Sequence, residues 1–290
     1  MRKSTQKISL SPKDKLSSII ENPEMLIKEV IKNLSINSNF TNLNNTFLWI
    51  DIAKKILKRH SDFSDKHILS LKYNLATVLC NKSDYINAKK LLNDIIRVCS
   101  VQKKVDKKLL TNSYYYLSIV LRRLGDFENA KANILYALDQ SKNNGNYYCE
   151  YAEILFKLDK HEEAKSNYEI ALEICLIKNG SSHPSSANIL FAYGYFLASI
   201  GKKNIGMKKM NDAYSILENT VGNTNLYSVR VLGHIANFLC LEKKYDKAFR
   251  NMNIVFSCIG NLFGSNNIET ITCKNNCARI LIKLKNMAKL

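Results

Sequence analysis

Small residues recur through this chain inside apolar stretches, at intervals of 42, 34, 42, 42 and 42 residues. They are Ala76, Ser118, Ala152, Gly194, Ala236 and Ala278. Twelve positions after each of the first five lies another small residue, in turn Ala88, Ala130, Ala164, Gly206 and Ala248. Two antiparallel helices approach closely only where a small side chain faces the neighbouring backbone. The register therefore predicts a series of tightly packed helix pairs.

Large apolar residues follow the second series at helical spacing. Four positions on stand Leu92, Ile134, Tyr168, Met210 and Met252, and three further on stand Ile95, Ala137, Ala171, Ala213 and Val255. Residues at this spacing share one face of a helix and can fill the gaps between pairs. One pair cannot bury its apolar face alone, so we expect an all-α fold in which antiparallel pairs stack into a right-handed solenoid.

The chain has few residues that break helices. Only 10 Gly and 3 Pro occur in 290 residues, which favours long helices joined by short loops over a β-sandwich. Gly180, Gly222 and Gly264 are again 42 residues apart and are expected to end the second helix of their pairs.

The segments YNLATVLCNKSDYINAKKLLNDI and EYAEILFKLDKHEEAKSNYEIAL resemble the tetratricopeptide family, over about residues 65 to 290. The 42-residue spacing, His183-Pro184 and Asn74-Leu75-Ala76 are similar to the kinesin light chain type of repeat. Other repeats carry Tyr116, Glu150, Ala192 and His234 where that type has Asn, and no heptad coiled coil precedes the repeats. The resemblance implies a TPR superhelix that binds protein partners, without enzymatic activity and without a cofactor.

We expect three parts along the chain. Residues 1–20 are predicted to be a flexible basic tail, and residues 21–64 a degenerate N-terminal helical repeat that caps the solenoid. There, Asn22-Pro23-Glu24 begins a helix that runs to about Leu34, and a second helix begins near Thr46. Residues 65–290 are predicted to form five repeats plus a C-terminal capping helix that turns Arg279, Lys283 and Lys285 towards water.

In the tetratricopeptide family the first helix of each pair lines a concave groove, and the resemblance transfers that role to fixed positions around each small residue. These positions are Tyr73, Asn74, Thr77, Tyr115, Tyr116, Arg122, Arg123, Glu150, Glu153, Lys157, Phe191, Tyr195, Arg230, His234, Asn237, Asn275, Asn276, Arg279 and Lys283. Tyr114 and Phe196 fall outside this register and are expected to pack between helices.

The groove residues predict the chemistry of the ligand. Amide side chains can hydrogen-bond the backbone of an extended peptide, and aromatic rings supply contact area at low entropic cost. Basic residues outnumber acidic ones, so we expect an acidic or aromatic-acidic segment of a partner protein, bound chiefly near Arg122, Arg123 and Lys157. Chaperone C-terminal tails are not expected, because Tyr73, Thr77, Tyr116, Glu150 and Gly233 replace the family's carboxylate-clamping residues.

Catalysis and metal binding find little support in the sequence. No glycine-rich phosphate loop, GxSxG or HExxH motif occurs. Cys273 and Cys277 could meet His234 one repeat away, but a fourth zinc ligand is missing. We therefore expect no catalytic site and no metal.

Charge and cysteine content leave alternatives open. The formal net charge of +18 allows an association with RNA, which makes a basic RNA-associated repeat protein the main alternative. Eight cysteines without a CxxC pair favour a reducing compartment, so we expect the cytoplasm. A mitochondrial assembly factor is the other alternative, with residues 1–18 as the targeting segment. No segment holds the roughly 18 consecutive apolar residues that a membrane-spanning helix needs.

Overall fold

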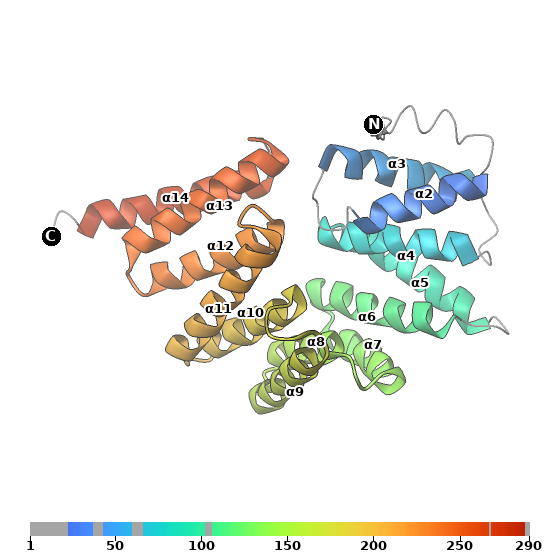
Figure 1. Cartoon of the computed structure of the whole chain (residues 1–290), viewed down its shortest axis with the longest axis horizontal. Coiled ribbons are helices and arrows are strands. Elements are labelled where there is room, and N and C mark those ends of the chain that lie inside the picture. The colour runs from blue at the N-terminus through green and yellow to red at the C-terminus, as the bar shows by residue number, and fades with distance from the viewer. Residues whose placement is uncertain (1–22, 37–42, 60–65, 102–105, 267, 288–290) are drawn as a thin grey trace, which may run out of the picture. The chain divides into compact units, whose positions relative to one another are not determined.

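The computed structural model describes residues 23–36, 43–59, 66–101, 106–266 and 268–287. Within those ranges every regular element is an α-helix (Figure 1). The helices are α2 (Pro23–Ile36), α3 (Leu43–Arg59), α4 (Lys66–Asn81), α5 (Tyr85–Val101), α6 (Lys107–Arg123), α7 (Phe127–Gln140), α8 (Gly145–Lys157), α9 (His161–Asn179), α10 (Pro184–Ser199), α11 (Lys203–Val221), α12 (Leu226–Leu241), α13 (Tyr245–Phe263) and α14 (Ile268–Met287). No helix of the described chain is long and apolar enough to cross a membrane.

The chain divides into two compact units, with the boundary between Val120 and Leu121 inside α6. In the first unit, α2 packs on α3 and α4, and α4 packs on α5. Ile27, Val30 and Leu34 occupy one face of α2 and are at most 5% exposed, which anchors that helix to its neighbours.

The first two helices extend beyond the bounds expected from the sequence. Helix α2 begins at Pro23 and continues to Ile36, and α3 begins at Leu43, ahead of Thr46. Thr46 is fully buried, as is Ala53. The expected tail at residues 1–20 and the expected capping residue Asn22 lie outside the described residues.

The second unit is a stack of helix pairs. Helix α8 packs on α9 and α10, α10 on α11, α11 on α12, α12 on α13, and α13 on α14. In both units the small residues that defined the repeat lie where the helices of a pair meet. Ala76 and Ala88 of the first unit and Ala130, Ala152, Ala164, Ala236 and Ala248 of the second are all 0% exposed. The expected stack of antiparallel helix pairs is confirmed.

The described turns within the pairs, from α4–α5 onward, share one geometry. Each carries a residue in the left-handed region, namely Ser83 (φ 62°), Gly125 (85°), Asp159 (63°), Gly201 (92°) and Lys243 (61°). The next amide donates to the carbonyl five residues earlier, as Lys244 N does to Leu239 O at 2.9 Å. This is the Schellman closure, which satisfies a helix-end carbonyl and reverses the chain in few residues.

A buried hydroxyl closes each of the last three repeats in the same way. Ser186, Ser228 and Thr270 donate at 2.7 Å to the carbonyls of Gly180, Gly222 and Gly264 respectively. Each glycine ends the second helix of a pair with a positive φ, as expected, and each hydroxyl belongs to the first turns of the next helix. The bond links the end of one pair to the start of the next, and it recurs at the 42-residue interval of these repeats.

Helix α14 differs from the earlier first helices of the unit. Its small residue, Ala278, is exposed, whereas Ala236 of α12 is fully buried. Arg279, Lys283 and Lys285 are exposed to solvent, as the sequence indicated.

Candidate functional site

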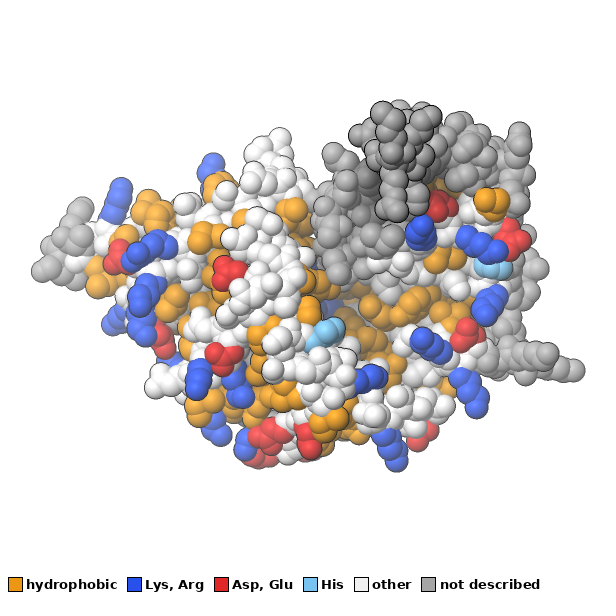
Figure 2. Space-filling view, viewed as in Figure 1, with side chains coloured by type: hydrophobic (Ala, Val, Ile, Leu, Met, Phe, Trp, Pro, Cys, Tyr) orange, Lys and Arg blue, Asp and Glu red, His pale blue; other side chains and the backbone are white. Residues whose placement is uncertain are grey.

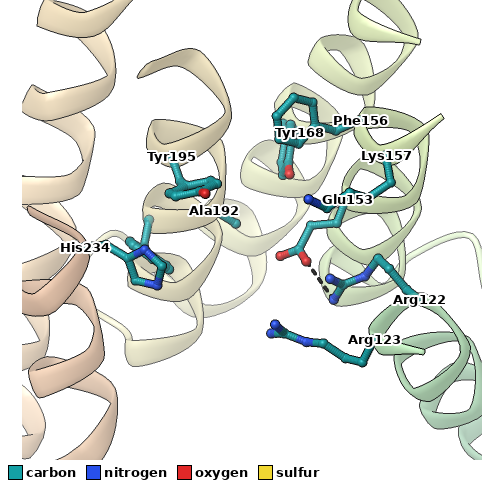
Figure 3. A pocket seen from close by; sticks show the side chains of 10 residues that line it. Arg122, Arg123, Glu153, Phe156, Lys157, Tyr168, Ala192, Tyr195 and His234 are labelled. Atoms are coloured by element: carbon teal, nitrogen blue, oxygen red, sulfur yellow. Dashed lines mark ion pairs between the residues drawn. The ribbon is translucent and has the colours of Figure 1, made fainter. Parts of the chain in front are cut away.

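The second unit contains a cavity of about 170 Å³ that receives side chains from α6, α8, α9, α10 and α12 (Figure 3). Its lining residues are Arg122, Arg123, Glu153, Phe156, Lys157, Tyr168, Phe191, Ala192, Tyr195 and His234. Figure 3 shows the rings of Tyr195 and His234 on one side and Arg122, Arg123 and Glu153 on the other. We call this the aromatic cavity.

An internal ion-pair network holds the charged side. Arg122 Nε lies 2.7 Å from Glu150 Oε1, Arg122 Nη2 lies 2.8 Å from Glu150 Oε2, and Nη2 also lies 2.6 Å from Glu153 Oε2. The Arg122 and Glu150 side chains are only 8% and 5% exposed. Burial lowers the pKa of Arg122, but Glu150 and Glu153 raise it more, so its pKa lies above the ordinary value and the guanidinium stays charged.

This network changes the roles that the sequence indicated for two residues. Arg122 was expected to attract acidic ligands, but two carboxylates already neutralise it and it ties α6 to α8. Glu150 was expected to face the groove, but its carboxylate is buried against Arg122. Arg123 and Lys157 remain as the solvent-exposed cations of the cavity. The cations Arg122, Arg123 and Lys157, set against the carboxylates of Glu150 and Glu153, give the cavity one net positive charge.

The opposite side is a cluster of aromatic rings. The His234 ring centroid lies 5.2 Å from those of both Phe191 and Tyr195, and Tyr195 meets Phe238 edge-on at 5.7 Å. Burial lowers the pKa of His234, as do nearby Arg123 and Arg230, whereas Glu153 raises it less. The imidazole is therefore neutral at pH 7 and forms part of an uncharged aromatic surface.

A second cavity, of about 320 Å³, lies between α12 and α14. Asn237, Cys240, Leu241, Asn276, Arg279, Ile280 and Lys283 line it. Ile280 is 3% exposed and Cys240 is half-buried, whereas Asn237, Leu241, Arg279 and Lys283 are exposed around them. We call this the basic cavity.

Five of the expected groove residues belong to the first unit. Tyr116 contacts Tyr73 and Tyr115 edge-on, with ring centroids 5.6 and 5.2 Å apart. Asn74 donates to the backbone of Ser70 at 2.8 Å, and Thr77, which is 8% exposed, donates to the carbonyl of Asn74. These polar groups thus bond within their own helix, beside a small aromatic cluster.

The sequence register identified most of the residues that line the two cavities. Of the expected groove residues, seven line the aromatic cavity and four line the basic cavity, while Asn275 is exposed and lines neither. Phe156 was missed although it lies four positions after Ala152, where the same register places groove residues. Tyr168 was also missed, because it lies on α9, the second helix of its pair, where the register places no groove residues. Tyr114 is half-buried and Phe196 is fully buried in the core.

Metal ligation is not built into the described part of the chain. It contains no group of three or more His, Cys, Asp or Glu side chains placed to hold an ion, so His234, Cys273 and Cys277 do not form one. All eight cysteines are free thiols, and burial raises the pKa of both Cys273 and Cys277. Both thiols are therefore protonated at neutral pH and poor nucleophiles.

Solved structures share this fold. A Rap protein complexed with competence and sporulation factor matches with a TM-score of 0.70 at 13% identity, over 92% of this chain and 80% of that one. A thermophilic TPR protein from Thermus thermophilus matches with a TM-score of 0.56 at 13% identity, over 74% and 99% of the two chains. Nearly identical TPR-like repeats of a putative kinesin light chain from Podosopora anserina give 0.52 at 13% identity, over 69% and 97%.

No family model and no curated protein sequence matches the chain. The structural matches nevertheless define its class: the chain has the fold of tetratricopeptide-repeat proteins. Repeats of the kinesin light chain type are among the structures that it resembles, as the 42-residue spacing indicated.

Proposed function

We propose that the chain is a non-enzymatic scaffold that holds a short acidic or aromatic-acidic segment of a partner protein in the aromatic cavity. The observation that carries this proposal is the pairing of an aromatic wall with the exposed cations Arg123 and Lys157 around one small cavity. A ring can pack against the wall while a neighbouring carboxylate meets the cations.

The size of the cavity supports a single side chain as its occupant. Its 170 Å³ compares with the roughly 150 Å³ of an engineered protein cavity that binds one benzene molecule. Sites for drug-sized ligands and cofactors are usually about 300–1,000 Å³. One net positive charge also suits one carboxylate. Among proteins of the same fold, a Rap protein is in complex with competence and sporulation factor, and binding of a partner is proposed here by analogy.

A cargo adaptor similar to kinesin light chains, acting in the cytoplasm, is one specific form of this scaffold. The 42-residue spacing and the likeness to kinesin light chain-type repeats support it. A fluorescent fusion expressed in the source cell would test the compartment, and a mitochondrial signal would favour the assembly-factor alternative.

An association with RNA is the second candidate, since the net charge is +18. On the face drawn in Figure 2, the Lys and Arg side chains of the described residues are spread over many helices rather than gathered in one tract. A salt titration separates the candidates. Binding dominated by phosphate contacts weakens log-linearly and steeply with salt, whereas a segment held by ring burial responds much less.

The direct test compares three forms of the full chain as bait in lysate of the source cell. They are the wild type, the Arg123→Glu/Lys157→Glu variant, and the control Lys178→Glu/Lys208→Glu, which makes the same charge change at exposed positions of α9 and α11. Arg122 is left intact because its replacement would break the buried network. We expect a nuclease-resistant protein partner that the wild type and the control retain and the cavity variant loses. Equal retention by all three forms would contradict the proposal.

A further inference from the structure

The basic cavity has a charge balance unlike that of the aromatic cavity. Arg279 and Lys283 line it and are exposed, while Asn237 and Asn276 add two amides. No Asp or Glu is among the described residues that line it. Glu242, the acid just beyond the end of α12, instead pairs with Lys244 at 2.8 Å. The basic cavity therefore carries two positive charges that its own lining does not offset.

Those two charges lie close together on one helix. Arg279 and Lys283 are four residues apart in α14 and so share one side of it. Like charges at this spacing repel each other, and an anion placed between them would remove that repulsion. The Lys283 ammonium also lies 5.9 Å from the centre of the Tyr245 ring, within the range of a cation–π attraction.

From this we infer that the basic cavity binds the phosphate of a phosphorylated serine or threonine in the same partner segment. This inference rests on the proposed function and adds a way to regulate it. A phosphomonoester carries about −1.5 to −2 charges at pH 7, which matches the two cations, whereas a carboxylate would offset only one. Its oxygens can accept a two-pronged pair of bonds from Arg279 and further bonds from Lys283 and the amides.

A phosphopeptide fits this cavity better than RNA does. Each phosphodiester of RNA carries one charge, and sequence-tolerant binding of single strands relies on aromatic side chains for base stacking. None of the described residues that line the basic cavity is aromatic. Its apolar lining residues, Cys240, Leu241 and Ile280, instead suit aliphatic parts of a peptide.

The position of the two cavities on α12 sets the spacing within the ligand. His234 lines the aromatic cavity, and Asn237 and Leu241 line the basic cavity, three and seven positions later on the same side of the helix. Along α12 the cavities are offset by three to seven residues, at a rise of about 1.5 Å per residue, and across α12 by one helix-to-helix step of about 8–10 Å. Together these offsets separate the cavities by roughly 10–15 Å. That is about three to five residues of extended chain. The phosphorylated residue should therefore lie about three to five positions from the aromatic one.

The test uses the synthetic peptide acetyl-GFDGGSG-amide, with the serine either free or phosphorylated, and a phosphorylated version in which Gly replaces both Phe and Asp. Calorimetric titrations would compare the wild type, the Arg279→Gln/Lys283→Gln variant and the control Lys274→Gln/Lys285→Gln, which removes two exposed charges from the same helix. Circular dichroism would check that each variant is folded.

We expect phosphorylation to tighten binding by about tenfold or more, through charge-assisted bonds. The Arg279→Gln/Lys283→Gln variant should lose that gain and the control should keep most of it. A gain that is absent, or lost equally in both variants, would overturn the inference. So would an eight-residue oligouridylate that binds more tightly than the phosphopeptide. The phosphopeptide without Phe and Asp tests the basic cavity alone, whereas failure of the free-serine peptide to bind any form would count against the aromatic cavity.

Discussion

Replacement of Gly206 by Ala should destabilise the second unit, although alanine is the better helix former. A Cβ atom on Gly206 would lie 2.5 Å from the backbone oxygen of Gly194 and 2.5 Å from the backbone nitrogen of Ala198. Ordinary contact begins at 3.4 Å, so α10 and α11 would have to separate locally by about 0.9 Å, the difference of the two distances. A gap of about 0.5–1 Å between the two helices would remove a quarter to a half of the dispersion energy of the contacts that it opens.

The net cost follows from two opposing contributions. Overpacking of this kind costs up to about 3 kcal/mol. The higher helix propensity of alanine returns about 1 kcal/mol. We therefore expect a loss of about 2 kcal/mol, which lowers Tm by about 4–8 °C for a unit of this size.

Gly233 provides the matched control in the same unit. It too lies inside a helix, α12, but a Cβ there would meet only the two methyl groups of Val255 at 3.8 Å, an ordinary contact. Gly233→Ala should therefore gain up to about 1 kcal/mol and raise Tm by about 2–4 °C. Thermal unfolding of the full chain, followed by far-UV circular dichroism, measures both variants. A Gly206→Ala variant at least as stable as the wild type would refute the reasoning from backbone contact.

Three further substitutions test other contacts in the same unfolding assay. Ser228→Ala removes the buried bond to the Gly222 carbonyl and should cost about 1–2 kcal/mol, so an unchanged Tm would show that the bond contributes nothing. Lys243→Gly relieves a left-handed backbone at φ 61° and should stabilise by up to about 1 kcal/mol, and a lower Tm would contradict this. Glu150→Gln leaves Arg122 with only the partly exposed Glu153 and should cost about 3 kcal/mol, whereas a loss below about 1 kcal/mol would mean that Glu153 compensates.

The sequence predicted the fold because close approach of helices requires small residues at fixed positions. Ala88, Ala130, Ala164 and Ala248 recur in register because any larger side chain there would separate a pair, and all four are fully buried. The hydroxyls of Ser228 and its equivalents recur at the same 42-residue interval, but a polar residue in a first turn has many uses. Only the structure shows that they bond to the preceding glycine.

Charge pairing in the candidate site could not be read from the sequence. Arg122 and Arg123 are adjacent, and a rotation of about 100° around α6 decides which one meets the carboxylates of α8. The sequence treated both as available cations, whereas the structure neutralises Arg122 and leaves Arg123 exposed. The size of the cavity could not be predicted from the sequence either, because Tyr168 enters the aromatic cavity from α9, the second helix of its pair.

The central claim is that the aromatic cavity selects a ring beside a carboxylate. The most direct measurement is a selection of random twelve-residue peptides displayed on phage against the wild-type chain, with counter-selection against Arg123→Glu/Lys157→Glu. We expect enriched peptides that share an aromatic residue next to Asp or Glu and that do not bind the variant. Enrichment of basic or purely aliphatic peptides, or of peptides that bind both forms equally, would contradict it.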